Sequence, residues 1–280
     1  MDLILEPGRT EKNYWRDLWR YRELFIILAW RDITVRYKQT VVGVAWAVIR
    51  PFLTMVVFTF FAKMVSSEIP KDVPIPLFVL AAVLPWTFFS TAMTESSNSL
   101  ISNSNLISKI YFPRLIVPAG SVITSFVDFL ITFGLMTLMM MFYLFVPDWH
   151  LLVLPLFILL AFGASFGIGL WLCALNVEYR DFRYIVPFIS QFGLFISPIA
   201  IATSKVPVIW HWHGLAIPAR MLFSLNPMVG VIDGFRWALL RGETLLWWPS
   251  LLTSIVLTVA LCLSGIWYFR KMERTFADVI

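Results

Sequence analysis

Residues 151–176 read LLVLPLFILLAFGASFGIGLWLCALN, a run without a single charged side chain. A helix of about 20 apolar residues crosses the roughly 30 Å hydrocarbon core of a bilayer, so this stretch is long enough to span a membrane. The whole chain has the same character, because 59% of its 280 residues are hydrophobic and 14% are charged. Soluble domains carry about 25% charged residues. The composition therefore excludes a water-soluble globule and indicates a polytopic membrane protein.

Further apolar stretches lie on both sides of this one. Each is about as long as a transmembrane helix, so we predict an all-α membrane protein with six spans. Residues 147–150 are enough for a tight hairpin between the third and fourth spans. The predicted spans are about 41–64, 75–94, 115–146, 151–176, 184–203 and 250–269.

The segment between the last two spans, 205–249, is not hydrophilic. Its two uncharged stretches, 206–219 and 221–232, are too short to span a bilayer and too apolar for a solvated loop. We therefore predict short re-entrant or interfacial helices here, interrupted by prolines.

The N-terminal region predicts an amphipathic helix over 11–32. Trp15, Trp19 and Arg22 fall at helical spacing, and the purely apolar part, 24–30, is too short to cross the bilayer. We expect this helix to lie in the cytoplasmic interface. The chain is thus divided into an N-terminal cytoplasmic segment, 1–40, and a six-helix transmembrane domain, 41–280.

Basic residues predict the orientation. The segments assigned to the cytoplasm contain fifteen Lys and Arg residues and the outer segments contain five, which places both termini in the cytoplasm. The same rule accounts for the net charge of +5, so we expect no nucleic-acid partner. The two cysteines each lie in an apolar run, and we expect no disulfide.

The sequence lacks the motifs of the common nucleotide and metal sites. It has no G-x-x-x-x-G-K-[ST] phosphate loop and no H-E-x-x-H motif. His211 and His213 lie in a W-H-W-H run typical of an aromatic interface anchor, with a metal site as the alternative. We expect a chain that is not an enzyme by itself and that binds no cofactor or metal.

Two connections are candidates for contact with a partner protein. Residues 96–114, SSNSLISNSNLISKIYFPR, predict a short helix that exposes apolar side chains near the membrane. We interpret this segment as a docking element. Residues 176–183 are charged, and for them the favoured interpretation is a loop that only fixes topology.

Four blocks carry a resemblance to a known family. They read WRDITVRYKQTVVGVAWAVIRPFLTMVVFTF (30–60), LPWTFFSTAMTESSNSLISNSNLISKIYFPRLIVP (84–118), GLWLCALNVEYRDFRYIVPF (169–188) and LNPMVGVIDGFRWALL (225–240). In this order they closely resemble the membrane subunit of ABC-2 type exporters of lipid-linked polysaccharides, such as O-antigen, capsule and teichoic acid. The resemblance covers nearly the whole chain from about residue 14.

The resemblance implies a set of partners. Two copies of the chain would form a channel in the bacterial inner membrane together with two separate ATP-binding cassette ATPase subunits. ATP and Mg would bind to those partner subunits. The cargo would be a polysaccharide on a polyprenyl diphosphate, such as O-antigen or a similar surface polymer.

The resemblance also implies roles for three segments. Segment 103–114 matches the coupling helix that contacts the ATPase and supplies Asn103, Asn105, Leu106, Ile107, Lys109 and Arg114. The N-terminal helix, 14–32, matches the interface helix and supplies Trp15, Trp19 and Arg22. Segment 207–248 matches the short helices at the outer end of the channel and supplies the gate residues Trp210, Asn226, Pro227, Arg236 and Trp237.

Helical spacing gives candidates for the channel lining. Aromatic faces stack on sugar rings without requiring one hydroxyl pattern, which suits a polymer that must slide. The alternative for each aromatic residue is ordinary helix packing. One face of the first span and one of the fifth supply Trp46, Arg50, Thr54 and Phe61, and Phe188, Gln191, Phe192 and Phe195.

Arg50 is the charged member of this set. An arginine within a span is costly unless it faces water or a partner. One hypothesis is that Arg50 meets the diphosphate of the lipid carrier. The other is an ion pair between Arg50 and Asp128 or Glu95.

Two other functions remain open. The nearer alternative is an ABC-2 exporter of a drug or of another lipid. A membrane-embedded transferase acting on polyprenyl-linked sugars would require acidic or histidine catalytic residues, and Glu178 with Asp181 is the only pair that resembles one.

Overall fold

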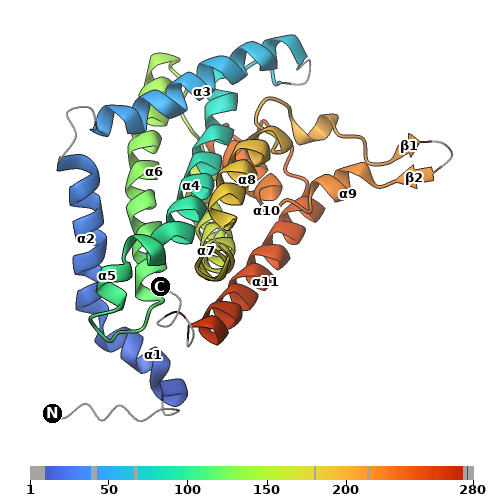
Figure 1. Cartoon of the computed structure of the whole chain (residues 1–280). Coiled ribbons are helices and arrows are strands. Elements are labelled where there is room, and N and C mark those ends of the chain that lie inside the picture. The colour runs from blue at the N-terminus through green and yellow to red at the C-terminus, as the bar shows by residue number, and fades with distance from the viewer. Residues whose placement is uncertain are drawn as a thin grey trace.

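The computed structural model describes residues 10–38, 43–65, 69–179, 181–212, 215–273 and 276. Helices dominate the described part of the chain (Figure 1). The elements are α1 (Thr10–Arg20), α2 (Arg22–Lys38), α3 (Gly43–Val65), α4 (Ile75–Ser102), α5 (Ser104–Ile107), α6 (Ile116–Phe142), η1 (Trp149–Val153), α7 (Leu154–Glu178), α8 (Phe182–Ile196), η2 (Thr203–Lys205), β1 (Trp210–Trp212), β2 (Leu215–Ile217), α9 (Ala219–Phe223), α10 (Pro227–Leu239) and α11 (Trp248–Met272).

Five of the described helices are long and apolar enough to cross a membrane: α3, α4, α6, α7 with η1, and α11. The predicted fifth span is shorter than expected, because α8 ends at Ile196 instead of near residue 203. Its 15 residues rise about 22 Å, less than the hydrocarbon core. Ser197 precedes a proline, which disfavours a helical conformation, and its backbone is extended (ψ 153°).

Helix α4 is the centre of the bundle. It contacts α3, α6, α7, α8 and α10, and its side chains from Leu77 to Leu84 are fully or almost fully buried. By contrast, most side chains of α3 are exposed, and Figure 1 shows α3 crossing α4 and α6 obliquely. Span α4 therefore packs against protein on nearly all sides, whereas α3 presents an apolar surface.

Helices α7 and α11 approach each other closely at two glycines. A Cβ added to Gly265 would lie 2.5 Å from the carbonyl oxygen of Gly167, and one added to Gly167 would lie 2.7 Å from the backbone nitrogen of Cys262. Small residues permit such backbone contact between membrane helices, whose association depends on packing.

One of the two predictions for the segment before α11 needs correction. The first predicted short helix, 206–219, contains instead the antiparallel strands β1 and β2, with Trp210 opposite Ile217. The second stretch, 221–232, does contain short helices, the end of α9 and the start of α10, and the burial of α10 in the core agrees with the re-entrant alternative and not with the interfacial one. Prolines 207 and 218 flank the hairpin, where extended backbone suits them.

The N-terminal helix also differs from the prediction. It is divided at Tyr21 into α1 and α2, and α2 continues to Lys38. Helix α2 lies beside α6 over part of its length (Figure 1). A polar cluster at the end of α2 accounts for this placement.

Candidate functional site

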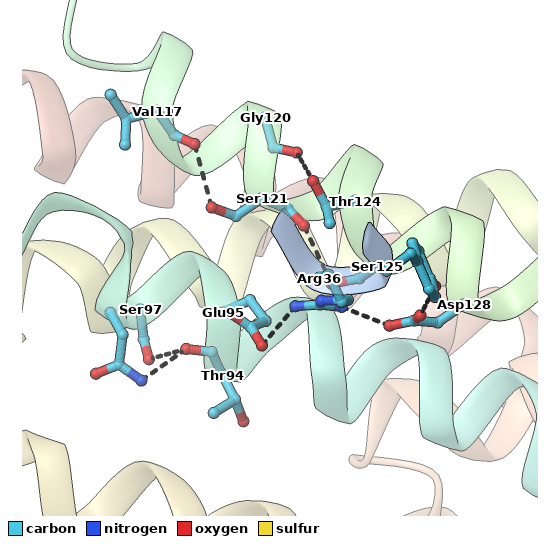
Figure 2. Close-up of polar contacts among 12 residues, drawn as sticks. Arg36, Thr94, Glu95, Ser97, Val117, Gly120, Ser121, Thr124, Ser125 and Asp128 are labelled. Carbon is cyan, nitrogen blue, oxygen red and sulfur yellow. Dashed lines mark hydrogen bonds and ion pairs between the residues drawn. The ribbon is translucent and has the colours of Figure 1, made fainter. Parts of the chain in front are cut away.

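Arg36, near the end of α2, lies between two carboxylates of the spans. Its Nη2 is 2.7 Å from Oε1 of Glu95 on α4, and its Nη1 is 2.5 Å from Oδ2 of Asp128 on α6 (Figure 2). The hydroxyl of Tyr37 donates to the other oxygen of Asp128. The three charged side chains are 24–46% exposed. Because Arg36 pairs with one carboxylate on α4 and another on α6, the cluster joins α2 to both helices.

A polar stripe on α6 adjoins the cluster. Its hydroxyl groups donate to carbonyl oxygens four residues earlier, as Ser121 does to Val117, Thr124 to Gly120 and Ser125 to Ser121 (Figure 2). On α4, Asn98 donates in the same way to Thr94. Each of these side-chain donors is thus satisfied by a carbonyl oxygen of its own helix. The side-chain oxygens keep lone pairs that can accept hydrogen bonds from groups outside the helix.

Two cavities flank Arg36 and Glu95. One, of about 490 Å³, is bounded by α2, α4 and α6 and includes Arg31 and Asn103. The other, of about 350 Å³, is bounded also by α3 and includes Trp46. Arg36 and Glu95 are in the walls of both, so the two cavities are adjacent, and we call the pair of cavities the α2 groove.

Arg50 and Trp46 both line the cavity of the α2 groove that α3 bounds. In the described part of the chain no ion pair joins Arg50 to Glu95 or Asp128, since both carboxylates are bound to Arg36. The ion-pair hypothesis for Arg50 is therefore wrong in this structure. Arg36 was missed as the partner because it lies outside the predicted spans. Thr54 donates to the carbonyl oxygen of Arg50 and does not reach the groove wall.

The aromatic candidates of the two predicted faces are exposed in the single chain. Phe188 and Phe192 lie in contact, with ring centroids 4.0 Å apart. Phe195 reaches α3 through Phe58, at 5.9 Å, and Phe58 in turn contacts Phe61. The ring contact between α3 and α8 therefore runs through Phe58, which lies outside the predicted face of α3. The exposed members of the whole channel-lining set are Trp46, Arg50, Phe61, Phe188, Gln191, Phe192 and Phe195.

The predicted coupling segment divides into packed and exposed residues. The expectation of exposed apolar side chains is wrong for Ile107, which is buried, and Leu106 packs against the same cluster. The reason is that residues 96–102 continue span α4, so the turn of α5 folds back onto the end of the bundle. Asn105 and Lys109 are exposed, together with two residues the sequence analysis missed, Ile110 and Tyr111.

Asn103 and Arg114 connect this segment to other elements. The side-chain oxygen of Asn103 accepts from Nη2 of Arg31 at 2.6 Å, which joins α2 to the start of α5. The backbone N–H of Arg114 donates to Oε1 of Glu273 at 2.8 Å, and its Nη1 donates to the carbonyl oxygen of Glu273 at 2.6 Å. Burial raises the pKa of Glu273, opposed by these donors. Arg114 therefore links the segment after α5 to the end of α11 within the chain.

The interface-helix residues face outward. Trp15 is 54% and Trp19 is 70% exposed, and Arg22 lies over the Trp19 ring at 5.4 Å. Such a surface suits the boundary between lipid headgroups and acyl chains.

The predicted gate residues occupy different environments. Trp210 is 57% exposed, whereas Asn226 caps α10 by accepting from the N–H of Met228, with Pro227 at the first helical position. Trp237 packs edge-on against His150 at 4.5 Å.

Arg236 is almost fully buried and donates only to carbonyl oxygens. Its acceptors are Phe78, Ile199 and Ile201, at 2.7–3.2 Å, and its guanidinium lies 3.7 Å from the Phe78 ring. One turn earlier, buried Asp233 accepts from the hydroxyl of Thr203. The spacing of Asp233 and Arg236 on one helix face is the signal that could have identified this cluster. Arg236 therefore holds the chain after α8 against α10 and α4.

No group of three or more metal-ligating side chains occurs among the described residues. His213 and Arg180 lie outside the described residues.

Known proteins resemble this chain along most of its length. An O-antigen export system permease protein RfbA from Myxococcus xanthus is 26% identical over 266 residues, covering 95% of this chain and 98% of the relative. A protein of the same name from Klebsiella pneumoniae is 26% identical over 92% of this chain and 95% of its own length. The polysialic acid transport protein KpsM of Escherichia coli is 22% identical over 76% of this chain and 79% of its own. Residues 23–240 match the ABC-2 type transporter family, and four of the five long apolar helices lie within this region. The chain therefore belongs to that family of transporter membrane subunits.

Proposed function

We propose that this chain is the transmembrane subunit of an ATP-driven exporter of a lipid-linked polysaccharide, such as O-antigen. The observation that carries the proposal is the similarity to O-antigen export permeases, which extends over 95% of this chain and 98% of the relative. In this proposal two copies form the path in the inner membrane, both termini are cytoplasmic, and two separate ATPase subunits bind ATP and Mg.

The exposed aromatic rings of α3 and α8 and the α2 groove would contact different parts of the cargo. The cargo has a hydrated sugar chain and an anionic diphosphate linkage. Exposed rings on α3 and α8 offer flat faces on which sugar rings slide. The guanidinium of Arg50 offers two parallel donors to a phosphate, and the absence of an ion pair to Glu95 or Asp128 in the described structure supports this role.

Coupling to the ATPase follows from the contacts at the cytoplasmic end. Force on the exposed residues Asn105 and Lys109 would pass into α4 directly and into α2 through the Asn103–Arg31 bond. Arg36 would carry movement of α2 to α6. Rigid elements joined in this way transmit displacement as a unit.

An export assay with Arg50 variants tests the proposal. In a strain that lacks its own export permease but has the ATPase, the wild-type chain should restore surface polymer. Arg50→Gln should lower export about 10–100-fold, the range expected for loss of a charged hydrogen bond, while the subunit level stays unchanged. Lys63→Gln, an exposed cation on the same helix, is the matched control and should export normally. Failure of the wild-type chain to restore any polymer would overturn the export function, and full export by Arg50→Gln would overturn only the role of Arg50.

A further inference from the structure

A cavity of about 800 Å³ lies outside the α2 groove, at the end of the bundle where α1, the chain after α5 and the end of α11 meet. Figure 1 shows α1 and the last turns of α11 at this same end. Its walls include Tyr14 and Tyr111 on one side and Leu263, Ile266 and Trp267 on the other. Nothing in the proposed transport path uses it.

The α11 wall is apolar and exposed. Leu263 is 66% and Trp267 is 62% exposed, and both belong to a helix that is long and apolar enough to cross the membrane. Such side chains face acyl chains in a bilayer, and a tryptophan near the end of a span is typical of the headgroup level.

Two cations follow directly on this apolar wall. Arg270 lies 4.6 Å from the Tyr14 ring, and Nζ of Lys271 lies 5.4 Å from the Trp267 ring. These cation–π contacts position both charges. Among the described residues neither forms an ion pair with a carboxylate, and Arg270 interacts electrostatically with Glu273 beyond ion-pair distance. The cavity wall also contains two acidic residues. Glu273 accepts a hydrogen bond from the backbone N–H of Arg114, and Asp17 lies on α1.

We propose that this cavity binds the phosphate headgroup of an anionic phospholipid, with the acyl chains along Leu263 and Trp267. The charges match a lipid phosphate, and the adjoining apolar wall matches the chains, whereas a soluble phosphate would gain nothing from that wall. The site is independent of the transport path, so its failure would leave the proposed function standing.

Lipid titration of the purified full chain in detergent, followed by native mass spectrometry, tests this site. The probes are phosphatidylglycerol, phosphatidylcholine with the same acyl chains, and inorganic phosphate. We expect one tightly bound phosphatidylglycerol per chain, and on the order of 30-fold weaker binding in Arg270→Gln/Lys271→Gln, since each basic residue contributes several-fold at an anionic surface. Phosphatidylcholine binding should be unchanged.

Two further variants keep the outcome interpretable. Lys63→Gln/Lys71→Gln removes the same charge from exposed positions at the α3–α4 connection and should leave phosphatidylglycerol binding intact. Arg270→Lys keeps the charge and should bind within a few-fold of the wild type, which separates binding from folding. Three outcomes would each overturn the lipid assignment. They are an equal loss of binding in Lys63→Gln/Lys71→Gln, unchanged binding in Arg270→Gln/Lys271→Gln, and displacement of the lipid by inorganic phosphate.

Discussion

Arg36 joins the N-terminal helix α2 to the spans α4 and α6. Its removal would leave the carboxylates of Glu95 and Asp128 without this cationic partner. We expect Arg36→Gln to lower the free energy of unfolding by about 1–2 kcal/mol, a value held down because the cluster is partly exposed. Thermal unfolding in detergent measures it. Arg36→Gln/Asp128→Asn should recover part of the loss, because the second change removes one of the two carboxylates that have lost their partner. Equal unfolding temperatures for the wild type and Arg36→Gln would show that the cluster does not stabilise α2.

Sequence reasoning identified Asp128, Glu95 and Arg50 as the charges that matter inside the spans but joined them incorrectly. Several arginines lie within reach of the predicted spans, and charge alone does not distinguish them. The choice depends on the path of α2, which becomes definite only when α2 packs beside α6. Trp46 and Arg50, one helical turn apart, were correctly placed on a common face, because that relation is local.

Glu273 gives a pH dependence whose direction is fixed by burial. Burial raises the pKa of this carboxyl in the folded protein above its value in the unfolded chain. The folded state then holds the proton more tightly, so the contribution of Glu273 to stability is largest below the unfolded pKa and is lost as the pH rises through the folded pKa. We expect Glu273→Gln to unfold at a higher temperature than the wild type at pH 8 and at nearly the same temperature at pH 4.

Glu243→Gln, at an exposed position, is the control for Glu273→Gln and should show no such trend. A lower unfolding temperature for Glu273→Gln at pH 8 would mean that the bond from Arg114 outweighs burial.

At the scale of the element, the contact between α7 and α11 depends on the absence of a side chain at Gly265. We expect Gly265→Ala to cost about 1–3 kcal/mol, because the added Cβ would lie 2.5 Å from a backbone oxygen that cannot move independently. Gly134→Ala on α6 is the matched control, since no atom lies within 4 Å of its added Cβ, and it should be neutral or stabilising. Both are compared by thermal unfolding in detergent, and equal effects of the two substitutions would contradict helix contact as the cause.

The coupling segment gives a second prediction at this scale. A charge at exposed Ile110 should reduce transport-linked ATP hydrolysis by the assembled complex without changing the stability of the subunit, because Ile110 contacts little else in the single chain. A charge at buried Ile107 should lower stability instead. ATPase activity and unfolding temperature of Ile110→Glu and Ile107→Glu separate the two effects. Unchanged ATPase activity in Ile110→Glu would remove this surface from the proposed coupling contact.

Long apolar elements were predictable from the sequence, and short ones were not. Spans such as α4 and α7 follow from length and composition alone. The hairpin of β1 and β2 lies between two prolines, and the chain after the early end of α8 is bonded to Arg236 of α10. Periodicity over a few residues could not distinguish these segments from helix. The burial of α10 was likewise hidden, because an apolar helix of 13 residues is equally compatible with an interface and a core.

For the whole molecule, we predict that the two ends of the helix bundle lie on opposite sides of the membrane. In Figure 1 the coupling segment and the last turns of α11 lie at one end, and the start of α4 lies at the other. The excess of basic residues at the first end predicts that it is cytoplasmic. Ser108→Cys and Lys71→Cys place exposed thiols at the two ends, in a Cys262→Ser background that keeps the buried Cys173. A membrane-impermeant maleimide should label Lys71→Cys in intact spheroplasts, and it should label Ser108→Cys only after permeabilisation. Labelling of Ser108→Cys in intact spheroplasts would place the coupling segment outside, where no ATPase could reach it, and would overturn the proposed mechanism at its first step.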